Sequence, residues 1–368
     1  MKPIGLYIHI PFCKGKCPYC DFYSVTPHGS VIEDYTAEVC RRLSAETRIF
    51  DTVYFGGGTP SLLGAENICR ILGSVNAADG CEMTLECNPS DTGGRGSNFD
   101  FKAVADAGID RISMGLQSSS DSERRFLGRR AGADDAERAV ERANAAGIDN
   151  ISLDLMLGLA GQSTESVGRS IEFCRRLGAK HLSAYLLKLE QGTPLYTRRN
   201  ELHLPDEDET AELYLFTVSE AAKNGFSQYE ISNFSLPGYE SRHNLKYWRC
   251  EEYLGIGAAA HSFVGGKRFY NERSIADFLE GKPPVNDGDG GDEEEFVMLA
   301  LRLTEGLSGE RFAERYGHML PREFDKKAAF FASKGLMTVG GERYSLTPQG
   351  FLLSNSIIFE LIDTLEAE

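Results

Sequence analysis

The sequence predicts an α/β fold, a partial (β/α)6 barrel followed by a smaller α+β domain at the C-terminal end. Two observations support this fold. Short runs of β-branched and aromatic residues begin every 28 to 46 residues, and each is followed by a Gly-containing turn and a stretch of helical periodicity. Polar residues also gather after several of these runs, as they do at the mouth of an α/β barrel, where the C-terminal ends of the strands carry the functional loops.

The six expected strands cover residues 6–10, 52–55, 83–86, 111–115, 151–156 and 181–185. Because the intervals between them have room for one helix each, the strands are expected to be parallel and connected by right-handed crossovers. The first strand has no Rossmann-type glycine turn after it, which favours a barrel over a dinucleotide-binding sheet. We assign residues 1–235 to this barrel.

The alternation stops after residue 185. A helix is expected over 206–224, followed by an aromatic-rich segment over 229–269, and residues 236–285 are expected to pack on the barrel. Residues 286–295 hold six acidic residues and three glycines, a composition typical of a solvated linker. Residues 296–368 show helical patterns and two strand runs around a Gly-Gly turn, an order similar to a winged helix. With 8 basic and 10 acidic residues, this domain is expected to pack on the barrel or cover a substrate rather than bind DNA.

The composition disfavours several classes of protein. The chain of 368 residues carries 39 basic and 55 acidic side chains, a net charge of −16, which disfavours nucleic acid as a partner. The longest early apolar stretch, 4–12, is too short for a membrane span and lacks a signal-peptide cleavage pattern. Nine cysteines, an odd number, argue against a disulfide framework. We expect a cytoplasmic protein with reduced thiols.

Three of the cysteines form the strongest signal in the sequence. Cys13, Cys17 and Cys20 lie within eight residues, directly after the first expected strand. Thiolates at this spacing bind zinc or an iron–sulfur cluster, because soft sulfur ligands select these metals. A structural zinc site needs a fourth ligand, which His9 can supply only by turning toward the loop. Three cysteines alone suit a [4Fe-4S] cluster with one iron open to another ligand, so the residues favour the cluster and leave zinc as the alternative.

Residues 7–22, YIHIPFCKGKCPYCDF, resemble the cluster loop of the radical S-adenosylmethionine (SAM) family. More narrowly, they resemble the branch that contains oxygen-independent coproporphyrinogen III oxidases and heme chaperones. Later segments are similar to this family in the same order, among them GGGTP at 56–60, TLECNP at 84–89 and LDLMLG at 153–158. The resemblance implies a [4Fe-4S] cluster on the three cysteines and SAM bound to its open iron.

The resemblance also implies which residues bind SAM. They share one expected location, the loops and strand ends at the mouth of the barrel: Tyr7, Tyr19, Gly57, Gly58, Thr59, Glu86, Gln117, Arg129, Asp154 and Ala184. SAM carries a sulfonium, an amino group, a carboxylate, a ribose and an adenine. It therefore needs mixed polar contacts on an apolar floor rather than a basic pocket.

Three features favour the chaperone side of the branch. Phe22 stands where the oxidase has a further cysteine. The first expected strand begins within six residues of the start, whereas the oxidase has a long N-terminal extension before this strand. Residues 243–248 also match the chaperones' His-Asn-x-x-Tyr-Trp signature, which implies heme binding by His243, Asn244, Tyr247 and Trp248. His243 is expected to offer its imidazole to the heme iron. The alternative is a hydrogen-bonded histidine beside ordinary core aromatics.

These features predict a SAM- and [4Fe-4S]-binding heme chaperone that delivers heme to acceptor hemoproteins, membrane respiratory enzymes among them. We also expect the protein to associate transiently with the membrane and to form a homodimer. If SAM is cleaved, an electron donor is a further expected partner. The alternative is a radical SAM enzyme that oxidatively decarboxylates coproporphyrinogen III. The sequence leaves open whether SAM is cleaved and assigns no catalytic residue.

Overall fold

The computed structural model describes residues 2–365, and its largest element is a twelve-stranded sheet in the order β12-β11-β10-β9-β1-β2-β3-β4-β5-β6-β8-β7. Six neighbouring parallel strands form the centre of this sheet. They are β1 (Ile4–Ile10), β2 (Phe50–Gly57), β3 (Ala77–Cys87), β4 (Arg111–Gln117), β5 (Asn150–Leu157) and β6 (His181–Leu186). Each contains one predicted strand, so the predicted parallel α/β architecture is confirmed.

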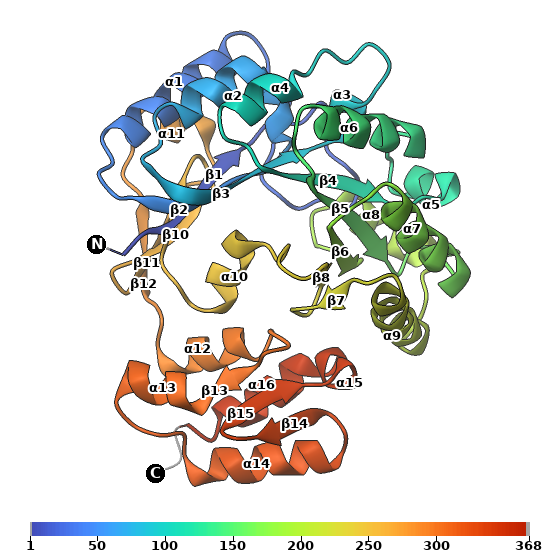
Figure 1. Cartoon of the computed structure of the whole chain (residues 1–368), viewed down its shortest axis with the longest axis vertical. Coiled ribbons are helices and arrows are strands. Elements are labelled where there is room, and N and C mark those ends of the chain that lie inside the picture. Colours follow the sequence, from blue (N-terminus) through green and yellow to red (C-terminus); the bar gives the residue numbers. More distant parts are fainter. Residues whose placement is uncertain (1, 366–368) are drawn as a thin grey trace.

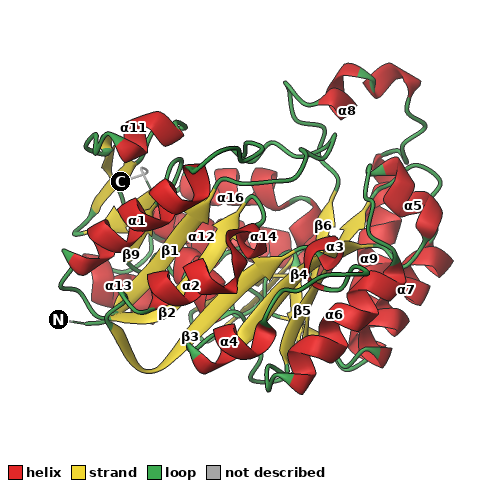
Figure 2. Ribbon diagram, turned by 90° about the horizontal axis from the view of Figure 1, so that it is seen from above, coloured by secondary structure: helices red, strands yellow, loops and turns green. Residues whose placement is uncertain are grey.

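Helices cover the outer face of the curved sheet (Figures 1 and 2): α1 (Val31–Ser44), α2 (Gly64–Leu72), α4 (Phe101–Asp106), α6 (Ala133–Ala145) and α7 (Thr164–Arg176). The apolar positions of α6 show why it lies there, since four buried residues recur at helical spacing, Ala136, Ala139, Val140 and Ala143. The predicted helix over 206–224 is confirmed as α9 (Glu207–Lys223), which begins at a capping box formed by Asp206 and Glu209. Shorter helices connect these elements: η1 (Pro60–Leu63), α3 (Pro89–Thr92), α5 (Asp121–Phe126), α8 (Pro194–Thr197) and η2 (Arg199–Glu201).

Short strands that the sequence did not predict extend the sheet at both edges. On one side, β9 (Tyr253–Ile256) pairs in parallel with β1, and β10 (His261–Val264), β11 (Lys267–Tyr270) and β12 (Val285–Asp289) follow antiparallel. On the other side, β8 (Asn233–Ser235) pairs with β6, and β7 (Ser227–Gln228) with β8. Helix α11 (Ile275–Leu279) lies beside α1, whereas α10 (Arg242–Trp248) lies on the concave side of the sheet (Figure 1).

The solvated linker expected over 286–295 stays a prediction, but much of this segment has regular structure. Asn286 pairs with Phe269 of β11 as part of β12, and Asp292 caps the N-terminus of α12 (Glu293–Ala300). The acidic side chains of β12 are exposed to solvent, and its backbone pairs with β11. An acidic segment can therefore form a strand here. The domain boundaries at 235 and 285 stay a prediction, and the sheet runs across both of them.

The C-terminal region has a second apolar core, separate from that of the barrel. Its remaining elements are β13 (Leu307–Ser308), α13 (Gly309–Tyr316), α14 (Arg322–Ser333), β14 (Met337–Gly340), β15 (Arg343–Leu346), α15 (Pro348–Leu352) and α16 (Ser354–Ile362). The antiparallel pair β14–β15 confirms the predicted hairpin, and β13 adds a third strand. Within residues 2–365, no helix is long and apolar enough to cross a membrane.

Candidate functional site

The three cluster cysteines lie in a loop that is tied back to the end of β1. The amide of Cys13 donates to the carbonyl of Val25 at 3.0 Å, and the amide of Val25 donates to the carbonyl of Pro11 at 2.8 Å. A third bond, from Cys20 N to Cys17 O at 3.1 Å, closes the turn that carries the other two thiols. The loop therefore presents three partly exposed free thiols on one side of the barrel's mouth.

The thiols are neighbours, but they do not form a site for one ion. Burial raises the pKa of Cys20, and the nearby Cys17 and Cys13 raise it further. Among the described residues, no three His, Cys, Asp or Glu side chains are arranged to hold a single metal ion. His9 is committed elsewhere, with Nδ1 3.0 Å from the Tyr7 hydroxyl and Nε2 3.1 Å from the carbonyl of Tyr23. His9 is therefore not free to complete a zinc site in this conformation, and three thiols without a fourth protein ligand are the donor set that suits a [4Fe-4S] cluster.

The glycines after β2 let the chain pass against the cysteine loop. Gly58 donates to the carbonyl of Ile10 at 2.8 Å, and Thr59 donates to the carbonyl of Phe12 at 2.7 Å. A Cβ atom on Gly58 would lie 2.6 Å from the Phe12 carbonyl oxygen. Gly57 has a positive φ of +108°, and a Cβ atom there would collide with the His9 ring. Both positions therefore need glycine. The Thr59 hydroxyl lies 3.5 Å from Cys13 Sγ.

Two half-buried carboxylates lie on the inner face of the sheet below this loop. Glu86 accepts a hydrogen bond from the Tyr54 hydroxyl at 2.8 Å and another from the amide of Gly57 at 3.2 Å. Burial raises the pKa of Glu86 to about 7, against the lowering effect of Tyr54, and burial raises the pKa of Asp154 to about 6. Such poised carboxylates are typical of ligand sites rather than of structural ion pairs.

Gln117 and Arg129 converge at the end of β4. The ladder shifts register between Gly115 and Gln117, and Gln117 has φ 70°, which turns its side chain toward Arg129. A Cβ atom on Gly115 would lie 2.7 Å from Arg129 Nη2 and 2.8 Å from Gln117 Nε2, so both groups lie over this glycine. Arg129 Nε is buried and lacks a hydrogen-bond partner among the described residues. Tyr19 hydrogen-bonds to Arg129 and lies near Cys17.

The mouth therefore brings together nearly all of the residues that the sequence singled out for SAM. Tyr7 joins them through its ring, which stacks on Tyr54 at 6.2 Å between centroids. The Ala184 side chain lies in the apolar core and its amide donates to the carbonyl of Ser232, so its role at the mouth stays a prediction that concerns its backbone carbonyl. An unpartnered buried donor, two half-buried carboxylates and a glycine cradle fit a ligand that carries an amine, a carboxylate and a ribose.

The comparisons with known proteins identify the family of this chain. Residues 7–174 match the model of the radical SAM superfamily, and residues 293–353 match the HemN C-terminal domain. Heme chaperone HemW of Bacillus subtilis is 36% identical over 95% of this chain and 97% of its own length, and HemW of Escherichia coli is 34% identical over 97% and 98%. The chain belongs to the HemW family of radical SAM proteins. In fold it is similar to the radical SAM enzyme coproporphyrinogen III oxidase (HemN) of E. coli, with a TM-score of 0.81 over 98% of this chain and 90% of that one at 19% identity.

The HemW-type signature lies on α10, and the barrel anchors the N-terminal end of this helix. The Glu82 carboxylate accepts hydrogen bonds from the amides of His243 at 3.0 Å and Arg242 at 3.1 Å. Glu82 is 6% exposed, and a carboxylate at a helix N-terminus also favours the helix dipole. Behind it, Arg111 is buried, and its Nε and Nη1 have no hydrogen-bond partner among residues 2–365. Burial lowers the pKa of Arg111, but Glu82 raises it, so the guanidinium stays charged.

His243 does not present a free nitrogen to a heme in this conformation. It is 1% exposed, with Nδ1 2.8 Å from the Thr52 hydroxyl and Nε2 2.7 Å from the Tyr247 hydroxyl. Its ring stacks on Tyr54 at 5.2 Å, and burial lowers its pKa to about 3. This geometry corresponds to the hydrogen-bonded alternative, and a role as iron ligand requires one of these two bonds to be broken first.

The signature residues also fall into two groups around α10. His243 and Tyr247, one helical turn apart, share the side that faces the barrel. Trp248 lies about 100° further around the helix and lines a cleft against the C-terminal domain. Asn244 is half-buried, and its amide is capped by the Ser241 hydroxyl at 3.4 Å.

Sequence reasoning missed the polar partners inside the barrel, among them Thr52, Tyr54, Glu82 and Arg111. The signal was present, because residues on one face of a strand alternate with period two. In β2, Thr52 and Tyr54 alternate with buried Val53 and Phe55, and in β3, Glu82 and Glu86 share one face. A barrel interior lined by such residues differs from the packed apolar interior of most α/β barrels.

Proposed function

We propose that this chain is a heme chaperone that binds heme and delivers it to acceptor hemoproteins. The observation that carries the proposal is the similarity to HemW proteins along nearly the whole chain, which includes both the mouth of the barrel and the C-terminal domain. The likeness to HemN supports a shared fold only.

In this proposal Cys13, Cys17 and Cys20 hold a [4Fe-4S] cluster, and the mouth holds SAM. When bound, these groups supply one-electron chemistry at the SAM sulfonium. The chain's residues bind and orient SAM. Gly57 and Gly58 allow close approach of the backbone, Glu86 offers a carboxylate to the ribose, and Arg129 offers its unpartnered Nε. The acceptors in this proposal include membrane respiratory enzymes. The remaining proposed partners are an electron donor and a second copy of the chain.

Anaerobic reconstitution with iron and sulfide, followed by heme loading, tests the function. The loaded protein is mixed with apomyoglobin, and the spectrum of the acceptor is followed against an equal concentration of free heme. We expect saturable heme binding and transfer that depends on the chaperone. Non-saturable binding would reject the proposal. Decarboxylated porphyrin formed from coproporphyrinogen III would replace it with the enzymatic alternative.

A further inference from the structure

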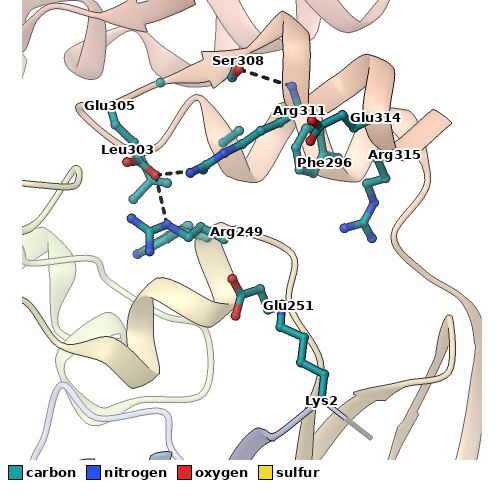
Figure 3. Close-up of a pocket in the computed structure, with 13 residues that line it drawn as sticks. Lys2, Arg249, Glu251, Phe296, Leu303, Glu305, Ser308, Arg311, Glu314 and Arg315 are labelled. Carbon is teal, nitrogen blue, oxygen red and sulfur yellow. Dashed lines mark hydrogen bonds and ion pairs between the residues drawn. The ribbon is translucent and has the colours of Figure 1, made fainter. Parts of the chain in front are cut away.

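A cleft of about 460 Å³ lies between the end of α10 and the C-terminal domain (Figure 3). Such a volume is within the usual range for ligand sites, roughly 300 to 1,000 Å³. The lining comes from the start of the chain, from the end of α10 and the loop after it, and from α12, α13 and the loop between them. Two regions that are far apart in sequence therefore form its opposite walls.

Apolar groups form part of each wall. Trp248 stands on the barrel side, and Phe296, Ala300 and Leu303 stand on the C-terminal side. The Arg315 guanidinium lies over the Phe296 ring at 5.3 Å and donates to the carbonyl of Cys250 at 3.2 Å, which fixes this aromatic wall against the loop after α10. A flat apolar ligand thus meets Trp248 on one side and Phe296, Ala300 and Leu303 on the other.

The charge of the lining is opposite in sign to that of the chain. Four basic and three acidic side chains line the cleft, in a protein with a net charge of −16. Glu305 is shared, since Arg249 Nε lies 3.0 Å from its carboxylate and Arg311 Nη1 lies 3.6 Å from the same oxygen (Figure 3). Glu251 is held by Lys246, which is outside the cleft lining. Arg311, whose side chain is 56% exposed, is therefore only weakly compensated and can bind another carboxylate.

We propose that this cleft holds the heme cargo, with Trp248 against the porphyrin face and Arg311 against the propionate carboxylates. The proposal rests on the proposed function, that the chain binds heme. A porphyrin is flat and apolar and has its two carboxylates on one edge, which corresponds to the distribution of aromatic and basic groups in the cleft. The exposed Arg311 edge leaves part of the cargo accessible to an acceptor.

The position of the cleft separates it from the mouth. Lys2 lines the cleft just before β1 begins, whereas Cys13 follows the end of β1. A seven-residue strand is about 23 Å long, so cargo and SAM lie at opposite ends of β1. His243 and Tyr247 face the barrel and do not line the cleft, whereas the half-buried Trp248 does.

Porphyrin titrations of the full-length protein test the proposal. The probes are ferric heme, metal-free protoporphyrin IX and the dimethyl ester of protoporphyrin IX, which lacks free carboxylates. We expect Trp248→Leu to weaken binding of both carboxylate-bearing probes about tenfold. We expect Arg311→Gln to weaken their binding about fivefold and to leave ester binding unchanged. Lys326→Gln and Phe359→Leu, which change an exposed charge and an exposed aromatic ring outside the cleft lining, are the matched controls.

The outcomes separate this proposal from the proposed function. Saturable heme binding by the wild type with unchanged affinity in both cleft variants overturns the cleft site and leaves the heme-binding function in place. Equal weakening of the ester by Arg311→Gln overturns the role of Arg311 in binding carboxylates. A wild type that does not bind heme saturably overturns both proposals. Circular dichroism and thermal unfolding confirm that each variant is folded before its affinity is compared.

Discussion

Glu82→Gln is the most direct test of how α10 is held in the barrel. The carboxylate accepts two amide hydrogen bonds from the first turn of the helix, at 3.0 and 3.1 Å. Its negative charge also stabilises the charged form of the buried Arg111 more than any other carboxylate does. A glutamine side chain has the same size, but its oxygen can accept only one of these bonds. Its amide group then faces the other N–H, and the charge beside Arg111 is lost.

The magnitude follows from these contacts. A hydrogen bond to a charged acceptor contributes about 1.5 to 3 kcal/mol, so the lost bond costs about 2 kcal/mol. The uncompensated guanidinium adds about 1 kcal/mol, less than for a directly bonded buried pair. We therefore expect Glu82→Gln to lower the free energy of unfolding by about 3 kcal/mol. In an Arg111→Met background the same change should cost about 1 kcal/mol less, because no buried charge remains to be balanced.

Urea unfolding followed by tryptophan fluorescence measures the free energy of unfolding with a probe on α10 itself. Trp248 is the only tryptophan of the chain and is the last residue of this helix. Hydrogen exchange of the α10 amides should rise in parallel. Glu201→Gln, at an exposed ion pair, is the control and should change stability by less than about 0.5 kcal/mol. A Glu82→Gln protein as stable as wild type, or strict additivity with Arg111→Met, would refute the reasoning.

Three further predictions follow from the mouth and from α10. Burial raises the pKa of Glu86 from 4.5 to about 7, so the folded chain keeps a proton that the unfolded chain releases, and stability falls as pH rises through this window. Glu86→Gln should remove this slope. Urea titrations should show that the difference in unfolding free energy between variant and wild type changes by up to about 2 kcal/mol from pH 5.5 to pH 8.5. A difference that is the same at both pH values would contradict this prediction. Gly58→Ala should displace the cysteine loop and lower the iron content after reconstitution, whereas Gly15→Ala, where a Cβ meets no atom within 4 Å, should not. His243→Ala should lower the free energy of unfolding by about 3 kcal/mol, because it leaves the hydroxyls of Thr52 and Tyr247 without their partner, and wild-type stability would argue against this role.

The centre of the fold was predictable because its strands carry their own signal. Residues of β1 and β2 that face the helices are strongly apolar, Leu6, Ile8, Val53 and Phe55, and each run is bounded by turn residues. The edge strands were not predictable in the same way. β12 consists of Val285 followed by polar and glycine residues, and it is a strand only because β11 satisfies its backbone. That pairing depends on distant residues and leaves no local pattern.

The mouth was predictable from the order of motifs along the chain, since parallel strands place their C-terminal ends together. The details of α10 were not recovered, although helical geometry contained part of the answer. Residues 243 and 247 are one turn apart and residue 248 is not, so one ligand cannot meet all three on one face. The hydrogen bond between His243 and Thr52 joins residues 191 positions apart, and no spacing rule reports such a contact.

The two ends of α10 are attached to different bodies. Glu82 of the barrel holds its first turn, and Arg249, the residue that follows its last turn, is bonded to Glu305 of the C-terminal domain. Lys246, in the last turn of α10, is also bonded to Asp51 of β2, so the barrel holds this helix along its length and the C-terminal domain holds only its end. A ligand carboxylate in the cleft would compete with Glu305 for Arg249 and Arg311, the contacts that join α10 to the C-terminal domain.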